Sequence, residues 1–140
     1  MSMVLDEKMG DGYSRTPLSW SRLRDHKPVV KLLLNTYNIE VDTKDENGRT
    51  VLSWAATQGS EYVKMLLDTG KVDIDTKDMN GRTPLLWAVA KRRDSVVKLL
   101  LDTGEVDIEA KDNKGRTPLT WAAIMGSKYV KMLLDTGKVN

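Results

Sequence analysis

The chain has 140 residues and no cysteine, and its 22 Lys and Arg against 20 Asp and Glu leave a formal net charge of +2. The missing cysteines exclude disulfides and thiolate sites, and His26 alone is too little for a histidine metal cluster. The balanced charge argues against a nucleic-acid binder over the whole surface. With neither a secretory signal pattern nor a membrane-spanning apolar run, we expect one intracellular domain, 1–140, cytoplasmic or nuclear and without a membrane role.

A period of 33 to 34 residues organises the chain. The four tryptophans are spaced 34, 33 and 34 residues apart, and each follows a threonine by four positions. Such a period indicates stacked units, none of which buries its apolar face alone. After an N-terminal extension at 1–10, the expected repeats are about 11–44, 45–77, 78–111 and 112–140.

One unit shows the expected elements in chain order. Residues 45–48 begin with Asp and end with Gly, which is typical of a type I turn. Thr50 can cap a short helix that Gly59 ends. A second helix then carries apolar residues at helical spacing and stops at Gly70, where we expect a left-handed backbone. Residues 72–76 alternate in polarity like a short strand.

This order of turn, helix, helix and extended return resembles the ankyrin repeat. The match rests on Thr-Pro-Leu at 16–18, 83–85 and 117–119, and on Leu-Leu runs before the glycines at 70, 104 and 137. The resemblance implies an all-α fold, a helical solenoid of about four stacked helix-turn-helix repeats with β-turn or hairpin connections. The wording of the repeats is similar to ankyrin arrays common in filamentous fungi. The family's signature histidine is replaced by Ser19, Ser53, Leu86 and Thr120, so the hydrogen bond of that ring is missing or replaced.

Several motifs that resemble catalytic or ligand-binding sites have a structural explanation instead. Asp-Thr-Gly at 68–70, 102–104 and 135–137 matches the triplet around an aspartic-protease carboxylate, but each copy ends an apolar helix. Asp73 and Asp75 lack the glycine and distal glutamate of a calcium loop. The constant place of the tryptophans predicts packing between repeats rather than an aromatic ligand ladder. We therefore predict no catalytic residue, no metal site, no cofactor and no small-molecule substrate, and expect a protein that is not an enzyme.

The resemblance implies a protein–protein interaction module whose partner lies on the concave face of the array. The scaffold residues recur, so binding residues are sought at the turn tips and first-helix ends, where the repeats differ. Three of these residues, Met79, Ile124 and Met125, are apolar where solvent is expected, which is typical of a contact surface. The candidates are Leu23, Arg24, Glu46, Asn47, Arg49, Thr57, Gln58, Met79, Asn80, Arg82, Lys91, Arg92, Asn113, Lys114, Arg116, Ile124 and Met125.

Positive charge gathers around the same predicted face. Eleven Lys and Arg side chains stand there against four acidic ones. In an alternative interpretation many of them form local ion pairs within the scaffold, because they recur together with Asp in the repeats. The excess favours an acidic protein partner. A polyanion or nucleic-acid binder, and the repeat arm of a larger multidomain signalling protein, are the alternatives. The fourth repeat keeps apolar helices where a terminal repeat needs a polar face, which predicts either continuation past Asn140 or end-to-end self-association through that repeat.

Overall fold

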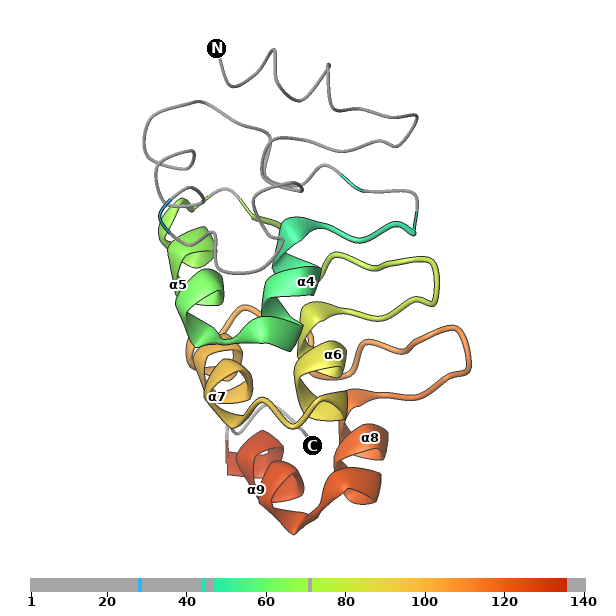
Figure 1. The fold of residues 1–140 in the computed structure, drawn as a ribbon. Helices are drawn as coiled ribbons and strands as arrows, with labels where there is room; N and C mark the ends of the chain where they lie inside the picture. Colours follow the sequence, from blue (N-terminus) through green and yellow to red (C-terminus); the bar gives the residue numbers. More distant parts are fainter. Residues whose placement is uncertain (1–27, 29–43, 45–46, 71, 136–140) are drawn as a thin grey trace.

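A computed structural model describes residues 28, 44, 47–70 and 72–135 (Figure 1). The first expected repeat therefore lies outside the described residues, apart from Pro28 and Lys44. The described part contains helices and no strand, which confirms the predicted all-α class. The helices are α4 (Val51–Gln58), α5 (Ser60–Asp68), α6 (Pro84–Ala90), α7 (Asp94–Asp102), α8 (Pro118–Met125) and α9 (Ser127–Asp135).

A threonine caps the first helix of every described pair. Thr50, Thr83 and Thr117 have extended backbones, and each hydroxyl accepts a hydrogen bond from the amide three residues on, at 3.3, 3.3 and 3.2 Å. The bond satisfies one of the amides that a helix start leaves without an intrahelical partner. Pro84 and Pro118 then occupy the first helical turn, where their missing N–H costs nothing.

Hydroxyl pairs stand in two repeats at the position of the signature histidine. The Thr50 and Ser53 hydroxyls lie 3.4 Å apart, and those of Thr117 and Thr120 lie 3.1 Å apart. In the third repeat Leu86 is fully buried instead. The position of the signature histidine is therefore taken by a short hydroxyl contact in two repeats and by a buried leucine in one.

The helices form two layers. Helices α4, α6 and α8 pack side by side in one layer and α5, α7 and α9 in the other, while the long loops project from the first layer (Figure 1). The layers meet over leucines that are fully buried, among them Leu52, Leu66, Leu85, Leu100 and Leu133. We call the surface made by α4, α6, α8 and their loops the inner face.

The return segment at 72–76 is a turn, so the expectation of a short strand was wrong. The Asp75 amide donates to Asp73 Oδ1 at 3.1 Å, and the Thr76 amide donates to the Asp73 carbonyl at 3.3 Å. Asp107 binds the Glu109 amide in the same way at 3.0 Å. The aspartate side chain offers the backbone a local partner that replaces strand pairing.

Neighbouring repeats are joined at the loop tips by hydrogen bonds. The Met79 amide donates to the Asn47 carbonyl at 3.0 Å, and the Asn113 amide donates to the Asn80 carbonyl at 2.9 Å. The Asn113 side chain adds a bond of 2.7 Å to the Met79 carbonyl. The three tips are thereby held in one row.

Behind the tips, lysines repeat one contact from unit to unit. Lys44 Nζ donates to the Lys77 carbonyl at 2.9 Å, and Lys77 Nζ donates to the Lys111 carbonyl at 3.1 Å. Two cations counted on the predicted binding face are therefore engaged within the array.

A carboxylate fastens the third repeat to the fourth on the second-helix side. Asp94 accepts hydrogen bonds from Lys128 Nζ at 2.6 Å and from the Tyr129 hydroxyl. The Lys128 bond, followed by the Tyr129 bond, lowers the Asp94 pKa. Burial and the bond to Asp94 raise the pKa of Tyr129 to about 12. The phenol thus stays protonated as a donor across the physiological range.

The far side of the fourth repeat exposes positions that are buried one repeat earlier. Leu101 in α7 is 8% exposed, whereas the equivalent Leu134 in α9 is 49% exposed. Ala123 is exposed where the equivalent Val89 is fully buried. Among the described residues nothing covers this face, and self-association through it remains a prediction.

Two glycines with the same backbone angle test how closely the loop tips approach. Gly81 has φ +75, and an added Cβ would lie 2.8 Å from the Asn113 nitrogen; Gly115 has φ +77 and open space. Gly115→Ala should cost about 1–2 kcal/mol of unfolding free energy from the left-handed backbone alone. Gly81→Ala should cost about 1–3 kcal/mol more because the tips must separate. Urea denaturation measures both, and equal losses would contradict the close approach.

Candidate functional site

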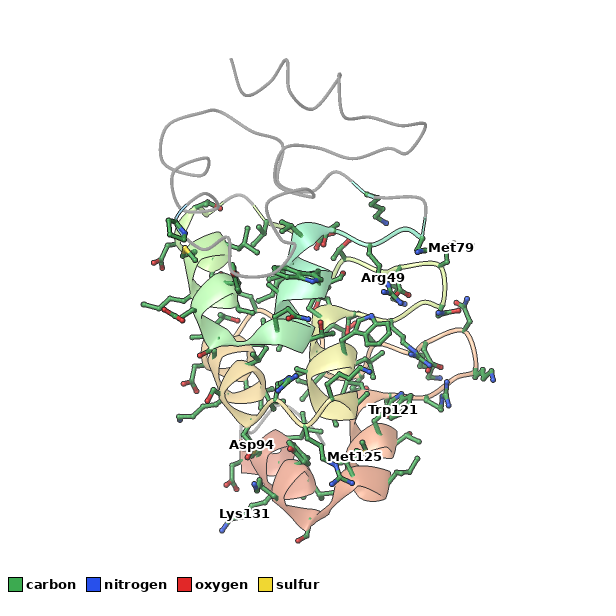
Figure 2. The ribbon with its side chains drawn as sticks, in the orientation of Figure 1. Arg49, Met79, Asp94, Trp121, Met125 and Lys131 are labelled. Atoms are coloured by element: carbon green, nitrogen blue, oxygen red, sulfur yellow. The ribbon has the colours of Figure 1, made fainter. Side chains whose placement is uncertain are left out.

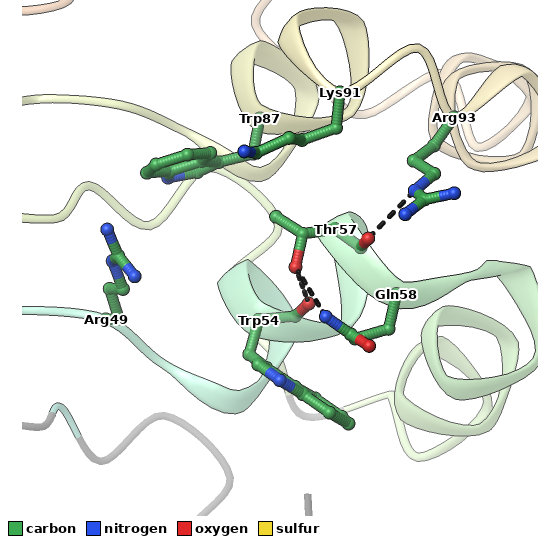
Figure 3. A pocket seen from close by; sticks show the side chains of 7 residues that line it. All are labelled: Arg49, Trp54, Thr57, Gln58, Trp87, Lys91 and Arg93. Atoms are coloured by element: carbon green, nitrogen blue, oxygen red, sulfur yellow. Dashed lines mark hydrogen bonds between the residues drawn. The ribbon is translucent and has the colours of Figure 1, made fainter. Parts of the chain in front are cut away.

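A groove of about 400 Å³ opens between the ends of α4 and α6 on the inner face (Figure 3). Three cationic residues, two tryptophans and two polar residues line it: Arg49, Trp54, Thr57, Gln58, Trp87, Lys91 and Arg93. No acidic residue is among the lining residues, so the lining itself carries a net positive charge.

Asp78 holds Trp87, which forms one wall of this groove, in place. Its Oδ1 accepts hydrogen bonds from the amides of Asn80 and Arg82, at 2.9 and 3.0 Å, which shapes the turn. Its Oδ2 accepts the Trp87 indole N–H at 2.8 Å, and Arg49 Nε lies 3.8 Å away. The carboxylate, with only 1% of its side chain exposed, therefore fixes the turn and the tryptophan together.

Guanidinium groups and indole rings alternate along the inner face (Figure 2 labels Arg49 and Trp121). Arg49 and Arg82 lie 4.7 and 4.9 Å from the centre of the Trp87 ring. Arg82 and Arg116 lie 5.4 and 4.7 Å from the centre of the Trp121 ring. Each such contact contributes about 0.5–1 kcal/mol at an exposed site. This Arg–Trp ladder spans repeats, which confirms inter-repeat packing for Trp87 and Trp121. Trp54 packs against Tyr62 of its own repeat, and Trp20 lies outside the described residues.

The fourth repeat uses the same aspartate differently. Asp112 Oδ1 binds the amides of Lys114 and Arg116, but its Oδ2 accepts Arg116 Nε at 2.9 Å. The Trp121 indole nitrogen is buried without a hydrogen-bond partner among the described residues, although its nearness to Asp112 still favours the charged form. Burial alone would raise the Asp112 pKa, yet these donors outweigh it and lower the pKa.

The loop between α6 and α7, residues 91–93, is two residues longer than the single-glycine turns of the other two described repeats, and it is strained. Gly59 and Gly126 make the corresponding turns with φ of 157 and 143, whereas Arg92 sits at φ 57. A side chain in that left-handed region costs about 1–2 kcal/mol. The longer loop directs Arg93 back over the second repeat, where its Nε donates to the Thr57 carbonyl at 2.8 Å (Figure 3).

Stacked helix pairs with threonine caps and projecting loops are what the sequence resemblance implied. A sequence model of ankyrin repeats, built of three copies, matches residues 3–78 and 70–140. The chain belongs to the ankyrin repeat family. Comparison with curated proteins finds no match. Ankyrin repeats generally mediate protein–protein interaction and are typically non-enzymatic scaffolds.

The groove brings together only some of the candidate contact residues of this ankyrin array. Arg49, Thr57, Gln58 and Lys91 line it. Arg82 and Arg116 lie in the Arg–Trp ladder. The exposed loop tips hold Asn47, Met79, Asn80, Asn113 and Lys114; outside these clusters lie Arg92 in the strained loop and Ile124 and Met125 at the end of α8. Leu23, Arg24 and Glu46 lie outside the described residues.

Sequence reasoning missed three lining residues. Trp54 and Trp87 were assigned to packing alone, and Arg93 was not a candidate. The available signal for Arg93 was the extra residue between the helices of the third repeat.

The described residues form neither a membrane-spanning helix nor a cluster of metal-binding side chains. No helix there has the length and apolarity needed to traverse a bilayer. No group of three or more His, Asp or Glu side chains is placed there to hold a metal ion.

The lowered pKa of Asp112 makes a prediction about acid stability. A depressed carboxyl pKa contributes stability above the unfolded value of about 3.9, and this is lost as the pH falls through the folded value. Asp112→Asn should cost about 2 kcal/mol at neutral pH, since a buried charge-assisted network is broken. Urea denaturation at a series of pH values should show this cost shrinking below about pH 4. A cost independent of pH would mean that the charge of Asp112 contributes nothing.

The strained arginine makes a second prediction. Arg92→Gly should raise the unfolding free energy by about 0.5–1 kcal/mol, because relief of strain exceeds the entropy cost of glycine. The neighbour Lys91, at φ −96, is the matched control, and Lys91→Gly should lower the unfolding free energy by about 0.5–1 kcal/mol. Thermal denaturation of both variants checks the signs. A loss of stability in Arg92→Gly would show that the loop is not strained.

Proposed function

We propose that the chain binds a protein partner on its inner face, the predicted concave face, and that this partner is acidic. The observation that carries the proposal is the groove between α4 and α6, where residues that differ among repeats stand beside a rigid scaffold. In repeat arrays the scaffold residues recur because packing constrains them. The exposed positions between them are free to vary and can contact a partner.

The rigidity of the groove supports this function. Trp87 is 8% exposed and is held by Asp78 and by cations on its ring. A preformed surface loses little conformational entropy when a partner arrives. The variable residues Thr57, Gln58 and Lys91 stand on this fixed support.

The balance of exposed groups supports an acidic partner. Lys91 and Arg93 are exposed, and neither forms an ion pair with any residue that the structure describes. Unpaired cations on one face raise the rate of encounter with an acidic surface. Met79, 65% exposed at a loop tip, adds an apolar contact point on the same side (Figure 2).

A site-specific photo-crosslinker tests where the partner binds. Gln58 is exposed in the groove, whereas Lys64 is exposed on α5 in the other helix layer and serves as the matched position. Irradiation in the native cell should give discrete protein adducts from position 58 and none from position 64, as read by gel shift and mass spectrometry. Adducts of equal yield from both positions, or none from position 58, would contradict binding at the inner face.

A further inference from the structure

The cations of the groove are spread along it rather than gathered at one point. Arg49 lies at one end and Arg93 at the other, with Lys91 between them beside Trp87 (Figure 3). The spacing suits several negative groups carried on one segment.

Trp87 and Trp54 in the groove are already in contact with other side chains of the chain. Arg49 and Arg82 both lie against the Trp87 ring, and the Lys91 ammonium lies 6.0 Å from its centre. Trp54 packs against Tyr62 edge to face, with ring centres 5.0 Å apart. At Trp87 a ligand would therefore meet cations that lie against the ring, and not a bare ring face as in the stacking platforms that bind single-stranded nucleic acid.

The strained loop delivers one of these cations. Arg92 holds a left-handed backbone, where the other two described repeats use glycine in a shorter turn. Strain of this kind persists where the surrounding structure fixes it, and it concentrates at functional sites. Here its result is that Arg93 reaches the Thr57 carbonyl through Nε. A guanidinium has five N–H donors, so four are left for a carboxylate.

From these observations we infer that the groove is a docking site for an extended protein segment that bears several carboxylates along its length. Arg93, Lys91 and Arg49, which are spread along the groove, meet successive carboxylates of the segment. Arg93 is the specificity-determining residue, and among the described repeats it is supplied by the longer loop of the third repeat. This inference rests on the proposed function, since it names the partner's chemistry at the same face.

Direct binding to the purified full chain tests the inference. The probe is a labelled short peptide of alternating Glu and Ala, compared with one in which Gln replaces Glu and with one bearing a single phosphoserine among Ala residues. Fluorescence anisotropy should show binding of the Glu peptide and much weaker binding of the other two. Affinity for the Glu peptide should fall steadily with added salt.

Charge variants localise the binding. Lys91→Glu and Arg93→Glu should each weaken the Glu peptide about fivefold. Arg93→Gln keeps a side-chain N–H donor for the Thr57 carbonyl but removes the charge, and should also weaken it. Lys131→Glu makes the same change of net charge on α9, where Figure 2 shows the side chain pointing away from the molecule, and should leave the affinity unchanged. Thermal denaturation confirms that each variant is folded.

Several outcomes would overturn the inference. These are equal affinity for the Gln peptide, an equal effect of Lys131→Glu, tighter binding of the single phosphoserine, and no binding of any peptide. The crosslink at position 58 separates the two proposals. Adducts there that persist in Arg93→Gln and Lys91→Glu would leave a partner on the inner face but exclude the carboxylate-bearing segment. If the chain with the crosslinker at position 58 and no charge substitution gives no adducts, the proposed function itself is contradicted.

Discussion

The aspartate that opens each turn, Asp78 or Asp112, organises the structure around it. One carboxylate oxygen closes the turn by binding two backbone amides, and the other holds either the tryptophan of the following helix or the arginine of the turn. A buried carboxylate must have such partners, because an unpaired buried charge costs several kcal/mol. The turn, the helix start and the ladder of rings therefore depend on one side chain per repeat.

That dependence explains why the inner face can be both rigid and variable. The ladder from Arg49 through Trp87 to Arg116 is built from residues that recur in every described repeat. Thr57 and Lys91 differ from their equivalents but stand on helices that the recurring residues hold in place. The scaffold thus tolerates change at these positions, because they contribute little to its packing.

Local rules were enough to predict most of the fold. Thr50, Thr83 and Thr117 cap the first helix of each described pair, and Gly70 takes a left-handed backbone at φ 68 as its place after a leucine-rich helix indicated. The turn at Asp73 was missed because a side-chain hydrogen bond competes with strand formation, and periodicity does not register that competition. Arg93 was missed for a similar reason, since its place in the groove follows from a backbone angle at Arg92 and not from its own type.

The lysine contact between repeats has a consequence for how such arrays change length. The Lys77 carbonyl accepts a hydrogen bond from the Lys44 ammonium, and the Lys77 ammonium donates one to the Lys111 carbonyl. Donor and acceptor are both lysines at equivalent positions of successive repeats. Each repeat therefore offers a carbonyl to the repeat before it and an ammonium to the repeat after it. A gene segment that encodes whole repeats can therefore be duplicated or deleted, and the new neighbours meet through a contact that already fits.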